Sequence, residues 1–413
     1  MNFAKPLAAE VHRRDRLPLT LIRATAALML AALGACATST PSDAPMAVRE
    51  AQGVVTLAND RGALAMDTVK GTFTKIPSLK TLYAKKFAVG VAIDDNCFKP
   101  AERALILAQF STVTPCNSLK MDATQPKEGH FTFEKADALV EMAQSAGLTV
   151  NGHTLVWHEQ CPDWFFKDHD QPAGKELVLE RMRTHITQVA GHFAGKIASW
   201  DVVNEALADG KDGYLRQTKW LDIAGPDFIA EAFKAAHKAD PHAKLYYNDY
   251  NLEDPDKRKK LLRMIRDLKA RHVQIDGIST QGHWCLNSIP FKDIEDTIKA
   301  IHAEGLAVAV SELDIDLFPN HSFGEKEGAP RDPYAAGLPP EVGHQLAQQY
   351  GQLFALLGKY PGVVSRVTFW GLDDGHSWLN TWPKMRVNHP LLWDRQLQPK
   401  EAFWEVVKQA EEK

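Results

Sequence analysis

The sequence predicts an α/β fold in which successive strand–helix units close into a (β/α)8 TIM barrel. From about Phe87 onward, short apolar runs rich in β-branched residues alternate with longer amphipathic stretches, a pattern typical of parallel sheets. Eight such units follow one another, which favours a closed barrel over an open sheet. No glycine-rich phosphate loop follows any run, which disfavours a nucleotide-binding fold.

The predicted strands are the apolar runs, and the predicted helices carry apolar residues at helical spacing. In order, the runs are Phe87–Ile93, Gln109–Thr112, Thr149–Leu155, Ile197–Val203, Lys244–Tyr247, Gly277–Thr280, Val308–Ser311 and Val364–Trp370. The helical stretches are Lys135–Ser145, Lys175–Ala194, Asp227–Ala239, Pro255–Arg271, Lys292–Glu304 and Pro340–Lys359. Polar and aromatic residues gather where the strands end, which is the face where barrels of this kind hold their functional sites.

The composition is that of a soluble globular protein with a large core, since 45% of the 413 residues are hydrophobic and 24% are charged. The formal net charge is −4, so nothing indicates a nucleic-acid partner. We expect the protein to be a monomer.

The N-terminal segment is predicted to be an export signal. Arg23 precedes the apolar run Ala24–Leu33, which is too short to span a membrane as a mature helix. The run ends in Leu-Gly-Ala-Cys, which resembles a lipobox in which Cys36 becomes the lipidated first residue. Simple cleavage after Ala37 is the alternative, because Ala-Cys-Ala also fits a small-x-small site.

These signals predict three segments: residues 1–36 as a lipoprotein-type signal peptide, 37–74 as a linker, and 75–413 as the barrel domain. The small, polar and proline-containing start of the linker is typical of a tether. We therefore expect export across the inner membrane and a periplasmic or outer-membrane lipoprotein, or alternatively an extracellular protein. A lipid on Cys36 would be its only link to a membrane.

Four cysteines lie outside the signal segment: Cys97, Cys116, Cys161 and Cys285. An oxidising compartment permits disulfides, and four cysteines allow three complete pairings between which the sequence does not choose. A bond between Cys97 and Cys116 is one option, because these two follow adjacent strands. No C-x-x-C pair occurs, so no zinc site is expected.

Two predicted strand ends each carry a glutamate where an ionisable group would be costly without a role and partners. One end reads Trp-Asp-Val-Val-Asn-Glu and finishes at Glu205, and the other reads Val-Ser-Glu-Leu-Asp with Glu312 at its centre. They belong to strands four and seven of eight, roughly opposite each other across the barrel. Hydrolysis of a glycosidic bond needs two such carboxyl groups.

Several strings, in this order, resemble the signature of glycoside hydrolase family 10, the endo-β-1,4-xylanases. They are GHTLVWH (152–158), WDVVNEA (200–206), NDYN (248–251), TQGHW (280–284), SELDID (311–316) and FWGLDDGHSW (369–378). The resemblance extends from about Leu79 to the C-terminus. It implies a retaining endo-β-1,4-xylanase that acts on xylan or decorated xylo-oligosaccharides by double displacement through a glycosyl-enzyme intermediate, without cofactor or metal.

By matching motif, Glu205 is the general acid/base and Glu312 is the nucleophile. In a retaining pair the carboxyl groups stand about 5–5.5 Å apart, so that one can attack directly. The acid must hold its proton until it is used, which burial and the neighbouring charge of Glu312 favour. That charge disappears when the glycosyl-enzyme forms, so Glu205 can then act as a base.

The resemblance also assigns supporting residues, with sugar positions numbered negatively on the non-reducing side of the cut. Asn204 is expected to bond the 2-hydroxyl of the −1 sugar, His283 to hold the nucleophile, and Asp314 to orient that histidine. The other matching positions are Lys120, His153 and Trp157 at −1, Asn117 at −2, Gln160 on the neighbouring surface, Gln281 against the catalytic pair, and Trp370 and Trp378 as aromatic walls, with His158 behind the site. Core packing stays open for the two tryptophans, as does a structural role for His283 and His158.

Three positions depart from the family pattern. Cys116 stands where the family has a glutamate that contacts the −2 sugar, and a thiol does not accept hydrogen bonds as a carboxylate does. Met121 replaces a common tryptophan, and Leu379 replaces an arginine beside the cleft. We therefore expect a weakened or reshaped −2 subsite and a preference for decorated or short substrates.

Three other functions stay open from the residues alone. Another retaining barrel β-glycanase, a cellulase or mannanase, would share the two glutamates. A metal-dependent barrel hydrolase could use His153, His158, His283 and Asp314, although no His-x-His pair follows the first strand. A non-catalytic glycan-binding barrel would need neither glutamate.

Overall fold

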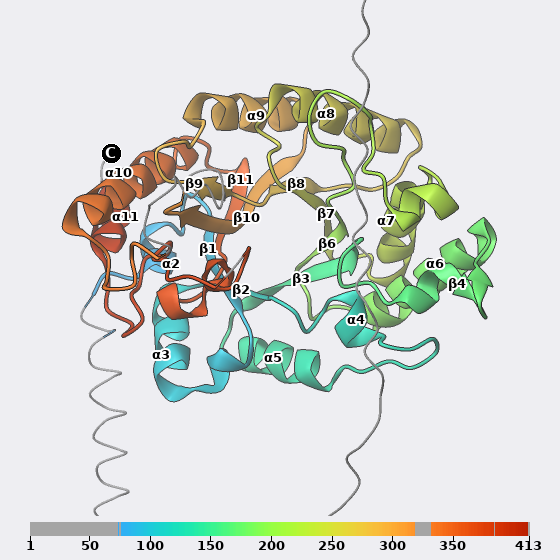
Figure 1. Ribbon diagram of the computed structural model, residues 1–413, viewed down its shortest axis with the longest axis horizontal. Helices are drawn as coiled ribbons and strands as arrows, with labels where there is room; N and C mark the ends of the chain where they lie inside the picture. The colour runs from blue at the N-terminus through green and yellow to red at the C-terminus, as the bar shows by residue number, and fades with distance from the viewer. Residues whose placement is uncertain (1–72, 74–75, 319–331, 384, 412–413) are drawn as a thin grey trace, which may run out of the picture. The chain divides into compact units, whose positions relative to one another are not determined.

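Eight parallel strands close into a barrel surrounded by helices in the computed structural model, which describes residues 73, 76–318, 332–383 and 385–411 (Figure 1). The barrel strands are β1 (Ala88–Ile93), β2 (Thr112–Pro115), β3 (Thr149–Val156), β6 (Ser199–Asn204), β7 (Lys244–Asp249), β8 (Gly277–Thr280), β10 (Ala307–Asp316) and β11 (Val364–Phe369). Neighbours along the chain are neighbours in the barrel, and β11 pairs with both β10 and β1 to close it. The predicted (β/α)8 fold is confirmed.

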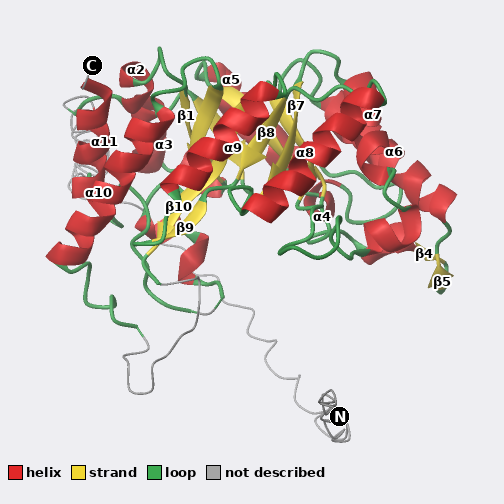
Figure 2. Cartoon of the chain, turned by 90° about the horizontal axis from the view of Figure 1, so that it is seen from above, coloured by secondary structure: helices red, strands yellow, loops and turns green. Residues whose placement is uncertain are grey.

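One long helix follows each barrel strand and packs outside it. These helices are α3 (Pro100–Gln109), α5 (Glu134–Ser145), α6 (Lys175–His192), α7 (Phe228–Ala239), α8 (Pro255–Ala270), α9 (Phe291–Ala303), α10 (Pro340–Leu357) and α11 (Glu401–Glu411). Figure 2 shows the strands running side by side beneath helices such as α8 and α9. None of the helices in the described ranges is long and apolar enough to cross a membrane.

Short elements decorate this ring. The helices α2 (Leu79–Leu82) and α4 (Met121–Thr124) are single turns, and β4 (Lys167–Asp168) pairs antiparallel with β5 (Gln171–Pro172). The strand β9 (His283–Cys285) pairs only with the last residues of β10, beyond the barrel. It therefore extends the sheet on the side where the strands end.

The second predicted strand is placed wrongly, by three residues. The run Gln109–Thr112 was expected to be a strand, but Gln109 is the last residue of α3 and β2 begins at Thr112. Proline at the first helical position and the residues Ala, Leu and Ile favour a helix up to that point. The Gln109 side chain then accepts a hydrogen bond from the backbone N–H of Leu79 (3.1 Å).

The barrel interior contains a chain of buried polar side chains that leads toward the strand ends. Arg366 donates to Ser199 (3.1 Å), and the Ser199 hydroxyl donates to Asn151 (2.7 Å). The Asn151 amide donates to Asp201 (3.1 Å), which also bonds the ring of His153 (3.2 Å). Because buried polar groups are costly without partners, this chain fixes the strands of the site relative to one another.

Outside the barrel, apolar side chains fill the space between strands and helices. Phe73, which falls within the predicted linker, is helical and only 6% exposed, and it belongs to this core. Residues 1–36, with the lipidation candidate Cys36, and nearly all of 37–74 lie outside the described residues. The predicted signal peptide and linker therefore stay predictions.

The option of a disulfide between Cys97 and Cys116 is wrong, because both carry free thiols, as does Cys161. Cys97 is fully buried in the core, whereas Cys116 lines a cavity at the strand ends. The two side chains therefore lie in different environments although their strands are adjacent.

Candidate active site

The two glutamates singled out from the sequence lie at the carboxyl ends of β6 and β10. Glu312 lies within β10, between Val310 and Leu313, where the pairing of β10 with β11 shifts register. An irregularity of this kind re-aims a side chain. Glu205 follows the last residue of β6 and has a positive φ of 56°, a conformation that costs a non-glycine residue about 1 kcal/mol or more.

Several hydrogen bonds hold the backbone at Glu205. Its N–H donates to the carbonyl of Asn248 (2.9 Å), and its carbonyl accepts from Arg216 Nε (2.9 Å). The N–H groups of the next two residues, Ala206 and Leu207, both donate to the Tyr247 hydroxyl (2.9 and 3.0 Å). These bonds offset the cost of the left-handed conformation and fix where the side chain points.

The Glu205 carboxyl group accepts hydrogen bonds at both oxygens. Trp157 Nε1 donates to Oε2 (3.0 Å), and Gln281 Nε2 donates to Oε1 (2.8 Å). Asn204 makes a longer contact with Oε1 (3.3 Å). The side chain is half-buried, so it is fixed in orientation and still reachable by a substrate.

Glu312 is 5% exposed and is also held at both oxygens. Asn248 Nδ2 donates to Oε1 (2.7 Å), and His283 Nε2 lies 3.2 Å from Oε2. The other ring nitrogen of His283 bonds Asp314 (3.0 Å), which accepts from Trp378 Nε1 (2.8 Å). Trp378, Asp314 and His283 thus form a continuous line of contacts that ends on the Glu312 carboxylate.

This line of contacts determines whether the Glu312 carboxyl group and the His283 imidazole are charged. Burial raises the pKa of Glu312, but hydrogen bonds from His283 and Asn248 and the positive charge of His283 outweigh it and lower that pKa to about 2. Burial likewise opposes the charge on His283, yet Asp314 and Glu312 raise its pKa to about 10. At neutral pH the site therefore holds an ionised carboxylate beside an imidazolium.

Two residues, Gln281 and Asn248, each bond both glutamates, one through its carboxyl group and the other through its backbone. Gln281 donates its side-chain amide to Glu205, and its carbonyl accepts the backbone N–H of Glu312 (2.7 Å). Asn248 donates to Glu312 and also to Asn204 Oδ1 (3.0 Å), while its carbonyl binds the Glu205 N–H. Shared partners of this kind bring the two glutamates to one site.

The other predicted site residues gather around the two glutamates. Lys120 Nζ donates to Gln160 (2.7 Å) and Asn117 (3.1 Å) and lies 5.0 Å from the centre of the Trp157 ring. The aromatic rings form edge and tilted contacts: Trp370 with His153 (5.3 Å between centres) and Trp378 with His283 (5.0 Å). His158 lines a small cavity with Glu205 and Trp220 and contacts the exposed Glu159 (3.9 Å), without a bond to either carboxyl group of the pair.

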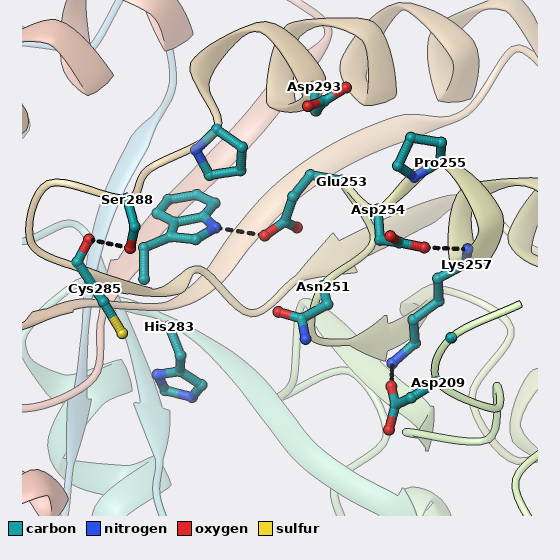
Figure 3. A pocket seen from close by; sticks show the side chains of 13 residues that line it. Asp209, Asn251, Glu253, Asp254, Pro255, Lys257, His283, Cys285, Ser288 and Asp293 are labelled. Carbon is teal, nitrogen blue, oxygen red and sulfur yellow. Dashed lines mark hydrogen bonds and ion pairs between the residues drawn. The ribbon is translucent and has the colours of Figure 1, made fainter. Parts of the chain in front are cut away.

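Two large cavities lie at opposite parts of the strand ring. One, of about 550 Å3, lies at the ends of β7, β8 and β9 and is lined by Asp209, Asn251, Glu253, Lys257 and His283, among others. Figure 3 shows Lys257 reaching toward Asp209 (2.8 Å). The Glu253 carboxylate accepts a hydrogen bond from Trp284 Nε1 (2.7 Å). The other, of about 640 Å3, lies at the ends of β1 and β2. Because β1 and β2 stand across the ring from β7 and β8, the two cavities lie on opposite sides of the strand ring.

The chain was compared with known proteins. The model of glycosyl hydrolase family 10 matches residues 78–409. The chain belongs to glycoside hydrolase family 10. It is 42% identical over 336 residues to a β-1,4-xylanase of Dictyoglomus thermophilum, which covers 81% of this chain and 91% of that protein. It is 39% identical over 338 residues to an endo-1,4-β-xylanase of Geobacillus stearothermophilus, with 81% and 99% covered.

Solved family 10 structures share the fold. A crystal structure of a xylanase from Paenibacillus barcinonensis, complexed with a conduramine derivative, superposes with a TM-score of 0.76 at 37% identity. The match covers 81% of this chain and 99% of that one. A family 10 endoxylanase from a sugarcane soil metagenome gives a TM-score of 0.77 at 36% identity.

The three departures from the family 10 pattern have different surroundings. Cys116 is half-buried and lines the cavity at β1 and β2. Met121 is 1% exposed at the start of α4, and Leu379 is fully buried. Leu379 therefore fills the core, whereas Cys116 changes the chemistry of a surface that a substrate can reach.

Sequence reasoning missed several residues that hold this family 10 site together. Asn248, Asp201 and Tyr247 are buried polar residues on β7 and β6 with bonds to the predicted residues. The sequence could have pointed to them, because Asp201 and Asn248 lie within the quoted motifs and Tyr247 ends the predicted strand Lys244–Tyr247. Lys257 gave no such signal, since it lies on a helix and only the fold brings it to the site. No group of three or more potential metal ligands occurs in the described part of the chain.

Proposed function

We propose that this protein is a retaining endo-1,4-β-xylanase that hydrolyses xylan or decorated xylo-oligosaccharides. The observation that carries the proposal is the geometry of the two glutamates. Glu312 is held ionised by His283 and Asn248, and Glu205 is fixed beside it through Gln281 and Asn248. The family 10 relatives that carry xylanase names match this chain along nearly their whole length.

In the first step the ionised Glu312 attacks the anomeric carbon of the sugar at −1. The bond from that carbon to the bridging oxygen breaks, and Glu205 gives its proton to the departing oxygen. The products are a glycosyl ester on Glu312 and a shortened chain with a free hydroxyl. Asn204 contacts Glu205 and is bonded to Asn248, a partner of Glu312, and we expect it to bond the 2-hydroxyl, a contact that strengthens in the transition state.

In the second step water replaces the departed chain. Glu312 has lost its charge by forming the ester, so Glu205, now a carboxylate, takes a proton from water. The resulting hydroxide adds to the anomeric carbon and releases Glu312 as a carboxylate. Two inversions give net retention. The His283 imidazolium stabilises the carboxylate that leaves, because it lies 3.2 Å from Oε2.

Product analysis on purified protein tests this proposal. On glucuronoxylan and arabinoxylan we expect xylo-oligosaccharides whose first-formed anomer is β, with little release from cellulose or mannan. Glu312→Ala and Glu205→Ala should each lose activity by several orders of magnitude, as removal of a nucleophile or of an acid does. Glu159→Ala is a matched control, because Glu159 is an exposed glutamate near the same site.

Activity on cellulose or mannan alone would instead assign the protein to another kind of retaining β-glycanase. An α-anomer formed first would contradict the double displacement, and loss of activity in the Glu159 variant would show that the assay reports stability rather than chemistry.

We propose separately that the protein is exported and anchored by a lipid on Cys36. The apolar run and the Leu-Gly-Ala-Cys string support this, and both lie outside the described residues. Expression in a Gram-negative host with labelled palmitate should label the wild-type chain and leave Cys36→Ala unlabelled. An unlabelled wild-type chain in the culture medium would instead support simple cleavage after Ala37.

A further inference from the structure

The cavity at the ends of β1 and β2 continues the active site on one side of the catalytic pair. Its lining includes Asn117 and Gln160, and both accept hydrogen bonds from Lys120. Lys120 in turn lies over the Trp157 ring, and Trp157 bonds Glu205. A volume of about 640 Å3 falls within the range of about 300–1,000 Å3 that is usual for ligand pockets. The cavity therefore has room for the sugar next to the one that is cut.

Cys116, the residue that follows β2, contributes a thiol to the lining of this cavity. Burial raises the pKa of Cys116 well above its usual value, and the nearby charge of Asp94 adds to the rise. The thiol therefore stays neutral, and a neutral thiol is only a weak hydrogen-bond donor and acceptor. Sugar hydroxyls that enter the cavity gain little from this side chain.

The neighbouring strand provides a carboxylate at the same level. Ile93, the last residue of β1, is paired with Pro115, the last residue of β2, so Asp94 and Cys116 follow the two strands side by side. Asp94 lines the cavity and is half-buried. Its Oδ2 accepts from Asn117 Nδ2 (3.0 Å), which leaves further lone pairs on the carboxylate for a ligand.

The surroundings of Asp94 act on the charge of its carboxyl group in opposite directions, and burial has the larger effect. Burial raises its pKa, whereas the hydrogen bond from Asn117 and the positive charge of Lys120 oppose that rise. Asp95, the next carboxylate along the chain, also lines the cavity but is exposed. Asp94 thus accepts a hydrogen bond from Asn117 and lies near the charge of Lys120, which itself bonds Asn117 and lies over the Trp157 ring.

We propose that Asp94 is a substrate-binding residue that accepts hydrogen bonds from the hydroxyls of the −2 xylose, in place of a carboxylate on β2. The proposal rests on the proposed xylanase function. It replaces the expectation of a weakened −2 subsite by a more specific one: the subsite keeps its acceptor, supplied from β1, and gains space where Cys116 stands. A side group on the −2 sugar would occupy that space.

Two aryl glycosides test the proposal. 4-Nitrophenyl β-xyloside needs only the −1 position, whereas 4-nitrophenyl β-xylobioside also occupies −2, so the ratio of their kcat/KM values measures the −2 contribution. In Asp94→Asn we expect this ratio to fall about tenfold or more, as loss of a hydrogen bond to a charged acceptor does. The ratio is insensitive to the folded fraction, because both substrates report on the same folded molecules.

Two further variants separate binding from structure. Glu141→Gln removes a carboxylate charge from the exposed surface of α5, outside the cavity lining, and should leave the ratio unchanged. Adding Cys116→Glu to Asp94→Asn returns a carboxylate to the cavity from β2 and should raise the ratio again, which no structural role of Asp94 would explain. Asp94→Ser serves as a second replacement if the asparagine variant is poorly produced.

An unchanged ratio in the Asp94 variants, or an equal fall with both substrates, would overturn the proposal. So would a double variant whose ratio stays as low as that of Asp94→Asn. A wild-type protein that cleaves neither glycoside and no xylan would show that the xylanase function itself is wrong, an outcome distinct from active protein with an unchanged ratio.

Discussion

His283 illustrates how much of the chemistry depends on single side chains. One ring nitrogen faces the Glu312 carboxylate and the other faces Asp314, which is fully buried. Charge on both sides keeps the imidazole protonated, with a pKa raised to about 10 against the opposition of burial. We therefore expect the histidine to act as a positioning residue that keeps Glu312, the proposed nucleophile, ionised.

Replacing His283 by alanine should shift the acidic limb of the pH profile of kcat/KM to higher pH. Glu312 would lose a hydrogen bond and a positive charge that lower its pKa, while burial, which raises it, would stay. The nucleophile would then need a higher pH to ionise. His302→Ala, on the exposed side of α9, is the control. An acidic limb at the same pH in both variants would contradict this account.

From the sequence, a residue could be singled out where its side chain stands in a recognisable string, and could not where only the fold makes its contact. Glu205, Glu312, His283 and Asp314 each occupy a distinctive position at a strand end. Lys257 does not, because a lysine in a helical stretch usually points to water and only the packing of α8 buries it. Roles for the predicted residues stay predictions until the variants are measured.

At the scale of elements, α8 supports the strand ends through that lysine. Lys257 is 1% exposed and binds Asp249 and Asp209, both at 2.8 Å. Asp249 also accepts from the Tyr247 hydroxyl (2.5 Å), and Tyr247 receives the N–H groups that follow Glu205. The helix is thereby connected to the backbone that carries the proposed acid/base.

Lys257→Met should destabilise the protein by about 3–5 kcal/mol, because it leaves the buried Asp249 carboxylate without its cation. It should also lower kcat more than it raises KM, since the Glu205 backbone loses part of its support. Denaturant unfolding and steady-state kinetics measure both effects. Lys259→Met, two residues along, should change neither, because the Lys259 side chain is 75% exposed. Equal stability of the two variants would refute the proposed support.

The contact between β3 and β6 gives a second prediction. A Cβ atom on Gly152 would lie 2.2 Å from the indole of Trp200, which is fully buried. Gly152→Ala should therefore lower the free energy of unfolding by about 1–3 kcal/mol through overpacking. In Gly191→Ala, on α6 with open space around it, the same change should be neutral or stabilising. Similar melting temperatures for both variants would contradict the close packing.

Element types were predictable from periodicity, but their boundaries and irregularities were not. The helix α3 reaches Gln109 because its apolar residues keep a helical spacing into the expected strand. The register shift in β10 that turns Glu312 depends on pairing with β11, a strand about fifty residues away in sequence. No local pattern carries that information.

At the scale of the whole molecule, the core extends beyond the predicted domain start. Phe73 is 6% exposed and belongs to the core, although it precedes residue 75. A chain that begins at 75 should therefore melt at a lower temperature than one that begins at 73. Burial of a phenylalanine contributes about 1.5–3 kcal/mol. Starting a third chain at 73 with Phe73→Ala should reproduce the loss, and three equal melting curves would contradict the role of Phe73.

The two cavities, at the ends of β1 and β2 and at the ends of β7, β8 and β9, bear on where along a polymer the proposed glutamate pair would cut. A site that accepts sugar units in both directions from the cut does not need a chain end, so it can cleave at internal positions along a xylan molecule. Each such cut reduces the average chain length sharply while creating only one new reducing end. The viscosity of a xylan solution should consequently fall well before much soluble sugar accumulates.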